Sequence, residues 1–169
     1  MSDSGALVVL IGAPGAGKTR TGKRVARLLD VPFIDIDKRI VATHGPIADI
    51  FATHGEPHFR RIEREEVRRA LAEHAVVTLG AGAVLDPDTQ IDLAGRHVVQ
   101  LCVDARAVQS RIAGGKRPLL TDGIGAWEKL VAARQPIYDE VSQLTIDTSR
   151  RPLDKVARRI VSWLGTQAQ

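Results

Sequence analysis

The sequence has few of the features that mark secreted or membrane-bound proteins. It contains a single cysteine, Cys102, so no disulfide can form within the chain, and we expect the reducing cytoplasm as its compartment. No run of about 18 apolar residues is present, and we therefore expect no contact with a membrane. The first residues lack the basic and apolar regions of a signal peptide.

Aromatic residues are also scarce, at 4% of the chain, while the formal net charge is +4. A positive charge can indicate a nucleic-acid partner, but no RNA-binding or zinc-finger pattern is present and the arginines are dispersed. A basic cleft for small anions explains the excess charge equally well. We therefore expect no nucleic acid as partner.

The most informative stretch is Gly-Ala-Pro-Gly-Ala-Gly-Lys-Thr at residues 12–19, between an apolar run and a helical pattern. This order of strand, glycine-rich loop and helix is typical of a nucleotide phosphate loop, because backbone amides and the helix N-terminus converge on an anion. Lys18 adds a cation for the outer phosphates, and the Thr19 hydroxyl can bind Mg²⁺. The pattern predicts a triphosphate held at Gly15, Ala16 and Gly17. A plain glycine-rich turn is the alternative.

Short apolar runs alternate with helical patterns along the whole chain, which at 169 residues fits one domain. We predict strands at 6–11, 31–36, 75–79, 98–103 and 144–147. We predict helices at 21–29, 37–43, 47–53, 56–74, after Asp104, and at 153–164. Such alternation favours a parallel sheet covered on both faces, with ligands beyond the carboxyl ends of the strands.

Two carboxylates, Asp35 and Asp37, end the second predicted strand. Residues two apart in an extended segment face the same side, so we expect both side chains near the phosphate loop. One can hold a water of the Mg²⁺ shell, and the other can accept a proton from a substrate hydroxyl. Alternatively, Asp37 only caps the next helix.

These motifs, together with Ile-Ala-Asp-Ile-Phe at 47–51, Phe-Arg-x-x-Glu at 59–63 and Arg-Pro-Leu-Leu at 117–120, resemble the shikimate kinase family over residues 7–164. The resemblance implies transfer of the ATP γ-phosphoryl group to the 3-hydroxyl of shikimate, a step towards chorismate and the aromatic amino acids. It implies an α/β three-layer sandwich with five parallel strands in the order 2-3-1-4-5. A substrate-binding region at about 37–63 and a lid at about 113–123 complete the implied fold.

The resemblance also implies roles on the substrate side. Asp35 would act near Mg²⁺ through a water, and Asp37 would bind the substrate hydroxyls and serve as base. Arg60 and Arg134 would bind the substrate carboxylate, and Glu63, three residues along the same helix, would hold Arg60. Without the resemblance, the Arg60 and Glu63 pair is a solvated ion pair, and Arg134 lies on a helix surface that Pro136 interrupts.

Aromatic and glycine-rich positions complete the implied substrate pocket. Phe51 and Phe59 match aromatic residues that line it, although each also fits an ordinary core. The family has three glycines where this chain has Gly80, Ala81 and Gly82. If Ala81 takes a negative φ the change has little effect; if not, substrate affinity falls or the acceptor differs.

On the ATP side, the resemblance assigns Arg117 of the lid to the γ-phosphate. Arg111 and the turn at 148–152 match elements that flank adenine, with Arg151 and Pro152 as the assigned contacts, although Arg150 is an alternative to Arg151. Arg20 occupies a phosphate-loop position where the family usually has a hydroxyl residue, which weakens an α-phosphate contact but spares the Mg²⁺ ligand.

Two other functions remain open. A kinase for another small metabolite, such as gluconate, would share the loop and the lid but not the Arg60, Glu63 and Arg134 set. A non-catalytic nucleotide-binding protein would need neither a base nor a lid arginine. With shikimate and ATP as its partners and Mg²⁺ as cofactor, we expect a monomer.

Overall fold

The computed structural model describes residues 5–113 and 123–169. A five-stranded sheet lies at its centre, in the order β2-β3-β1-β4-β5, and every neighbouring pair of strands is parallel. This is the predicted strand order, and the α/β fold class is confirmed. The strands are β1 (Val8–Gly12), β2 (Phe33–Asp35), β3 (Val76–Thr78), β4 (Val98–Cys102) and β5 (Leu144–Asp147).

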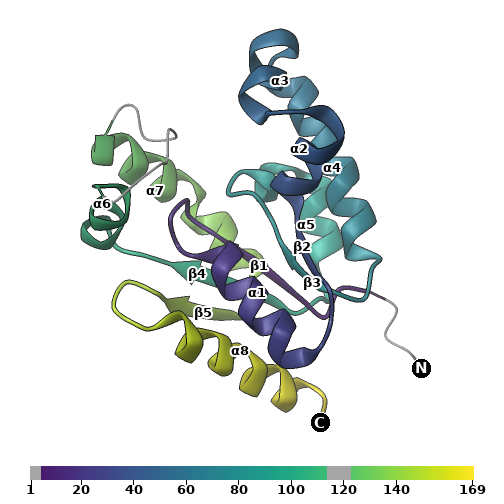
Figure 1. Cartoon of the computed structure of the whole chain (residues 1–169), viewed down its shortest axis with the longest axis vertical. Coiled ribbons are helices and arrows are strands. Elements are labelled where there is room, and N and C mark those ends of the chain that lie inside the picture. The colour runs from purple at the N-terminus through teal and green to yellow at the C-terminus, as the bar shows by residue number, and fades with distance from the viewer. Residues whose placement is uncertain (1–4, 114–122) are drawn as a thin grey trace.

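Helices cover both faces of this sheet (Figure 1). In chain order they are α1 (Lys18–Leu29), α2 (Ile36–His44), α3 (Ile47–His54), α4 (Glu56–Leu71), the short η1 (Ala83–Leu85), α5 (Pro87–Leu93), α6 (Ala105–Ala113), α7 (Gly123–Val141) and α8 (Leu153–Gln167). The helices α1 and α8 lie side by side on one face, while α4, α5 and part of α7 lie on the other. The result is the expected three-layer arrangement.

The alternation of side chains along β1 explains the two faces. Val8 and Leu10 pack into the cluster that includes α1 and α8, whereas Val9 and Ile11 pack into the cluster that includes α4 and α7. All four side chains are buried. A strand buried on both faces needs a continuous apolar run, and this is why the run could be identified in the sequence.

Several element boundaries differ from the predicted ones. Strand β2 is shorter than 31–36, because the Asp35 carboxylate caps α2 by accepting a hydrogen bond from the Lys38 amide at 3.1 Å. Helix α4 ends at Leu71 and not at residue 74. Pro136, expected to interrupt a helix, lies inside α7. Helix α5 was not predicted, although Asp86 caps its first turn and Pro87 follows as the first helical residue.

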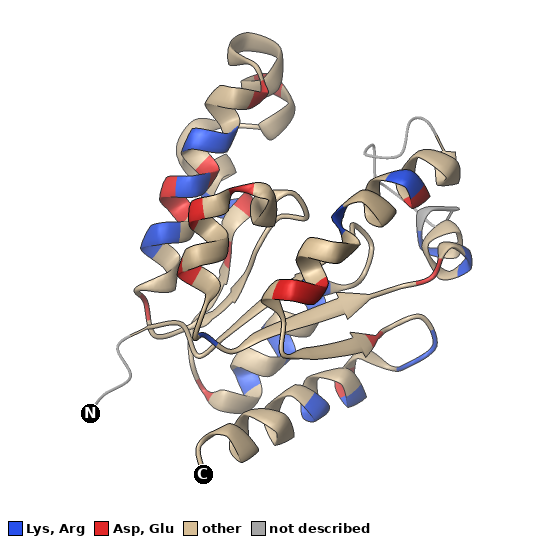
Figure 2. Ribbon diagram, turned by 180° about the vertical axis from the view of Figure 1, so that it is seen from behind, with Lys and Arg blue, Asp and Glu red and all other residues tan. Residues whose placement is uncertain are grey.

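Helices α2, α3 and α4 form a unit that extends beyond the carboxyl edge of the sheet (Figure 1). Acidic and basic residues alternate along the ribbon of α4 (Figure 2). Arg39 of α2 donates two hydrogen bonds to Glu73, at 2.5 and 2.8 Å, and so fastens this unit beside β3. None of the helices in the described part of the chain is long and apolar enough to cross a membrane.

Candidate active site

The phosphate loop connects β1 to α1 at the carboxyl edge of the sheet. Gly17, which precedes α1, has φ 88° and ψ 24°, a left-handed conformation that a residue with a side chain rarely adopts. Helix α1 can therefore begin directly at Lys18, with its first amides facing the loop. The Lys18 ammonium donates to the carbonyls of Gly12 at 2.7 Å and Ala13 at 3.0 Å.

Side chains from distant elements brace this loop. Arg111 of α6 donates to the Gly15 carbonyl at 2.6 Å and to the Thr148 carbonyl at 2.6 Å. The Thr148 hydroxyl donates to the Ala16 carbonyl at 2.8 Å. Arg20, in the first turn of α1, is exposed. The loop and the turn after β5 are thus joined through Arg111, at the side where the resemblance places adenine.

The two arginines of the turn after β5 have different surroundings. Arg150 forms an ion pair with Asp104 at 2.8 Å, whereas Arg151 and Pro152 are exposed at the start of α8. The predicted lid arginine, Arg117, lies outside the described residues.

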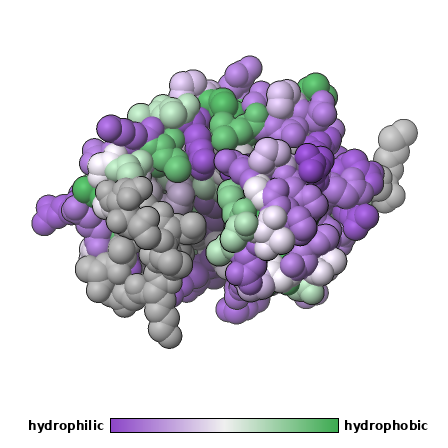
Figure 3. Space-filling model, turned by 90° about the horizontal axis from the view of Figure 1, so that it is seen from above, coloured by the Kyte–Doolittle hydropathy of each residue, from purple (hydrophilic) through white to green (hydrophobic). Residues whose placement is uncertain are grey.

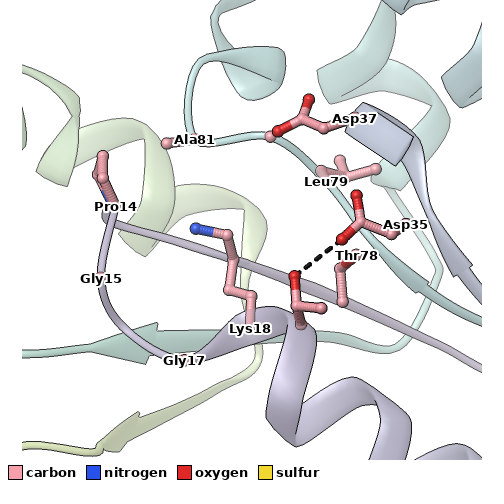
Figure 4. Close-up of a pocket in the computed structure, with 11 residues that line it drawn as sticks. Pro14, Gly15, Gly17, Lys18, Asp35, Asp37, Thr78, Leu79 and Ala81 are labelled. Atoms are coloured by element: carbon pink, nitrogen blue, oxygen red, sulfur yellow. Dashed lines mark hydrogen bonds between the residues drawn. The ribbon is translucent and has the colours of Figure 1, made fainter. Parts of the chain in front are cut away.

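Thr19 and Asp35 meet directly beside the loop. The Thr19 hydroxyl donates to Asp35 Oδ2 at 2.8 Å, as the dashed line in Figure 4 marks. Hydroxyl and carboxylate oxygens are the ligands that Mg²⁺ prefers, and Mg²⁺ takes most of its remaining ligands from water and substrate phosphates. Within the described residues, no group of three His, Cys, Asp or Glu side chains could hold a metal by itself. The pair fits an ion that the nucleotide brings with it.

Asp37 lies near Asp35, but not for the predicted reason. Asp35 is the last residue of β2, whereas Asp37 is in the first turn of α2, so the two do not share one face of a strand. The helix cap is Asp35, which makes the capping interpretation of Asp37 wrong. Burial raises the pKa of Asp37, as does the charge of Asp35, while Lys18 and Arg60 oppose the rise. A raised pKa brings a carboxylate closer to the range in which it acts as a base.

Arg60 and Glu63 form more than a solvated pair. Arg60 Nη1 donates to Glu63 Oε1 at 2.8 Å, and Glu63 is only 4% exposed. Burial raises the pKa of Glu63, and the hydrogen bond from Arg60 opposes that rise. Glu56, one turn earlier on α4, also accepts from Arg60 at 3.3 and 3.2 Å. The guanidinium is therefore oriented by carboxylates on two sides, so the surface-pair alternative is wrong.

Arg134 approaches the same group from α7. It is half-buried, and its charge acts on both Glu63 and Tyr138. Burial raises the pKa of the Tyr138 phenol, and Arg134 counteracts that rise. The two predicted carboxylate-binding arginines, one on α4 and one on α7, thus both act electrostatically on one buried acid, Glu63.

Phe59 lies against the Arg60 guanidinium, and Phe51 packs against Phe59. The rings of Phe51 and Phe59 are 4.9 Å apart between centroids, and the Arg60 guanidinium carbon lies 5.3 Å from the centre of the Phe59 ring. Phe59 is buried in the core, with Phe51 packed against it. The pair forms a floor that supports the guanidinium.

The turn after β3 passes close to both charged groups. A Cβ added at Gly82 would lie 2.6 Å from an Arg60 nitrogen, and one added at Gly80 would lie 2.9 Å from an Asp37 oxygen. Only glycine fits at these two positions without a shift of those side chains. Ala81 does not have a positive φ, since Asp30 is the one described residue other than glycine that does, so an alanine fits the backbone here.

A cavity of about 150 Å³ separates the phosphate loop from this turn (Figure 4). Lys18, Asp37 and Ala81 face it from different elements. Its walls are formed by Pro14, Gly15, Gly17, Lys18, Thr19, Asp35, Asp37, Thr78, Leu79, Gly80 and Ala81. Seen from above, the molecule is hollowed between α2–α4 and the side of α6 and α7 (Figure 3). The cavity can hold a phosphate beside a second small molecule.

Two aromatic residues of α7 contact the site in ways that the sequence did not reveal. The Trp127 indole, 4% exposed, donates to the Pro14 carbonyl at 2.9 Å. The Tyr138 hydroxyl donates to the Ala81 carbonyl at 2.7 Å. The burial of Trp127 is that of a packing residue. The only signal was that each aromatic carries a polar atom that needs a partner when buried.

Known proteins match this chain closely. The family model described as "Shikimate kinase" matches residues 14–165. The chain belongs to the shikimate kinase family. A shikimate kinase from Mycobacterium avium (strain 104) is 47% identical over 161 residues, which cover 92% of each chain. One from Mycobacterium tuberculosis (strain ATCC 25177 / H37Ra) is 45% identical, also over 92% of each chain.

Solved structures agree with this family assignment. Shikimate kinase from Acinetobacter baumannii in complex with shikimate has a TM-score of 0.86 at 28% identity, over 98% of this chain and 95% of that one. A gluconokinase from Sinorhizobium meliloti 1021 has a TM-score of 0.68 at 19% identity, over 98% of this chain and 94% of that one. The latter likeness concerns the fold alone, so the gluconate alternative is not favoured.

Proposed function

We propose that this member of the shikimate kinase family transfers the γ-phosphoryl group of ATP to the 3-hydroxyl of shikimate through the residues described above. The observation that carries the proposal is one cavity with a phosphate loop on one wall and the Asp37 carboxylate on the other. Arg60, oriented by buried Glu63, lies against the same turn as Asp37. A phosphate donor and a hydroxylated acid can thus be held end to end.

On the donor side, the loop amides and the N-terminus of α1 would surround the β- and γ-phosphates. Lys18 would move from the loop carbonyls to the phosphates and compensate their charge. Arg111, Arg151 and Pro152 would flank the adenine, since Arg150 is paired with Asp104. Arg117 would complete the charge compensation at the γ-phosphate.

Mg²⁺ would be held by Thr19 directly and by Asp35 through water, and it would neutralise charge between the β- and γ-phosphates. The 2.8 Å hydrogen bond between these two side chains supports their sharing one ligand.

On the acceptor side, Arg60 and Arg134 would each present a guanidinium to the substrate carboxylate, with two parallel hydrogen bonds available from each. Asp37 would accept the proton of the 3-hydroxyl as that oxygen attacks the γ-phosphorus. Gly80, Ala81 and Gly82 would bring backbone amides against the acceptor. Phe51 and Phe59 would support this pocket from below.

A coupled ADP-release assay with shikimate and, separately, gluconate tests the proposal. We expect Mg²⁺-dependent ADP release with shikimate and none above background with gluconate. Turnover of gluconate alone would assign the chain to another metabolite. ATP binding without turnover of either acid would make it a nucleotide-binding protein and overturn the proposal.

The proposal takes residues 1–169 as one kinase domain, with 37–63 as substrate-binding region and 113–123 as lid. It places the enzyme in the cytoplasm as a monomer, with ATP and shikimate as partners and neither nucleic acid nor membrane. The lone cysteine supports the compartment. Gel filtration at working concentration tests the monomer.

A further inference from the structure

Helix α7 donates side-chain hydrogen bonds to both loops that face each other across the cavity. Near its start, Trp127 holds the Pro14 carbonyl of the phosphate loop at 2.9 Å. Farther along, Tyr138 holds the Ala81 carbonyl of the opposite turn at 2.7 Å. Both aromatic side chains are buried, so the indole N–H and the phenol O–H each need a partner within the protein. One helix thereby sets the positions of two walls.

The second bond acts on a peptide group whose direction matters. The Leu79 amide still pairs with the sheet, but within residues 5–113 and 123–169 the amides of Gly80, Ala81 and Gly82 donate to no other group of the chain. In a trans peptide the C=O and N–H bonds point in opposite directions. By fixing the Ala81 carbonyl, Tyr138 therefore fixes the direction of the Gly82 N–H.

Tyr138 is itself firmly anchored. Its neighbours along one side of α7, Gln135 and Asp139, both bond to the buried Gln100 of β4, at 2.7 and 3.0 Å. The Tyr138 side chain is 1% exposed and packs in the core. The helix is thus the fixed partner in the bond, and the turn is the part that it restrains.

We infer that Tyr138 is a positioning residue for the phosphate acceptor: its hydroxyl holds the turn at 80–82 so that the amides of the turn point at the oxygen atoms of the bound acid. This inference rests on the proposed function. Ala81 adds a second restraint, because alanine has fewer accessible backbone conformations than glycine. The two restraints act on the same residue, and their loss should be more than additive.

The test compares Tyr138→Phe, which removes only the hydroxyl, with Ser142→Ala as control. Ser142 directly follows the last residue of α7, one turn beyond Tyr138, and its hydroxyl donates to the Tyr138 carbonyl at 2.7 Å, away from the cavity. We expect Tyr138→Phe to raise the KM for shikimate roughly five- to tenfold, as the loss of one buried hydrogen bond allows, with the KM for ATP unchanged. Adding Ala81→Gly should raise the shikimate KM further than the product of the single changes.

The inference is overturned if the KM for shikimate stays within about twofold of wild type in both Tyr138→Phe and the double variant. It is also overturned if both KM values rise together with a loss of stability, because that pattern indicates general loosening of the core. Ser142→Ala should leave both KM values unchanged. It shows how much the loss of one hydrogen bond at the end of α7, without a change at the turn, affects the kinetics.

A second measurement, by ¹⁹F NMR, needs no variant and no turnover. Tyr138 is the only tyrosine in the chain, so 3-fluorotyrosine labels it alone. We expect its ¹⁹F resonance to shift when shikimate is added to the ADP-bound protein, and an unmoved resonance despite shikimate binding contradicts the inference. A third measurement follows amide exchange of Ala83 and Leu85, which donate to the Gly80 and Gly82 carbonyls of the turn; their exchange in the free protein should quicken in Tyr138→Phe. If wild type fails to phosphorylate shikimate, the proposed function fails, and the exchange measurement still decides whether Tyr138 holds the turn.

Discussion

The two walls of the cavity are built by different means. The phosphate-loop wall consists of backbone groups, and its carbonyls are held by Lys18, Arg111 and Thr148. The opposite wall carries the Asp37 carboxylate on one side and the turn after β3 on the other, and the Arg60–Glu63 pair lies against this turn from behind. A backbone cradle tolerates changes in the side chains of the loop, whereas a buried charge network fails when one member is removed. Substitutions on the opposite wall should therefore have the larger effects on catalysis.

Asp37→Asn should have the largest effect, because it removes the proposed base while preserving its shape. We expect kcat to fall about 10²- to 10⁴-fold. ATP binding, measured by nucleotide titration, should not change, because the phosphate-loop wall is intact. Turnover equal to wild type would remove Asp37 from the mechanism. It would also contradict the expectation that substitutions opposite the phosphate loop have the larger effects.

Arg60→Lys keeps the charge but loses the planar fork that two carboxylates orient. We expect the KM for shikimate to rise roughly 10- to 100-fold, as for loss of charge-assisted hydrogen bonds, with the KM for ATP nearly constant. Arg61→Lys is the matched control, since Arg61 is the next residue of α4 and is exposed. Equal effects in the two variants would show that Arg60 acts only through net charge.

On the phosphate-loop wall, Thr19→Ala should act on the metal and not on the acid. Loss of the proposed Mg²⁺ ligand should raise the Mg²⁺ concentration for half-maximal activity roughly tenfold. The KM for shikimate should stay near wild type. An unchanged Mg²⁺ requirement would separate Thr19 from the ion despite its hydrogen bond to Asp35.

Asp37 and Glu65 should make the stability of the folded protein depend on pH with opposite signs. The raised pKa of Asp37 means that the folded protein binds its proton more tightly than the unfolded chain, whose value is near 3.8. Wild-type stability therefore falls as pH rises through the raised pKa. Asp37→Asn avoids this loss, so its melting temperature should exceed that of wild type at pH 7 and approach it near pH 4.

Glu65 is the matched opposite case. Hydrogen bonds from Arg68, and from Arg69, hold its pKa at about 2. These exposed ion pairs should contribute little to the stability of the protein. Glu65→Gln should still lower the melting temperature at pH 7. The difference from wild type should vanish as pH falls through the range from 4.5 to about 2. The same sign in both variants, measured by thermal unfolding across pH, would contradict the assignment of Asp37 as a buried, costly carboxylate.

Ala81→Gly should have the smallest effect. Ala81 lies outside the positive-φ region, so glycine and alanine both fit. With Tyr138 still holding the carbonyl, we expect kcat and both KM values within about twofold of wild type. A large change in steady-state kinetics would mean that the methyl group itself contacts a ligand.

Local sequence patterns predicted the phosphate-loop wall and most of the fold. Residues 12–19 are contiguous, and the buried strands are continuous apolar runs, so one sequence suffices to identify them. Helix α5 was missed, although Asp86 and Pro87 carry a start signal. The closeness of Asp35 and Asp37 was predicted from the wrong geometry, because the helix begins one residue before Asp37.

Contacts between distant elements could not be read from the sequence alone. Nothing near Tyr138 in the sequence points to Ala81, and nothing near Trp127 points to Pro14. Glu63 is buried beside the turn after β3, which is distant in the sequence, so the sequence left a surface pair open as an alternative. These contacts depend on tertiary packing. The family resemblance assigns roles to residues, but it does not show which contacts hold those residues in place.

A crystal structure of the protein with ADP, Mg²⁺ and shikimate tests the central claim most directly. We predict the shikimate carboxylate within hydrogen-bonding distance of both Arg60 and Arg134, and the 3-hydroxyl beside Asp37, facing the phosphate loop. Shikimate bound elsewhere, with both guanidinium groups directed to solvent, would contradict the claim.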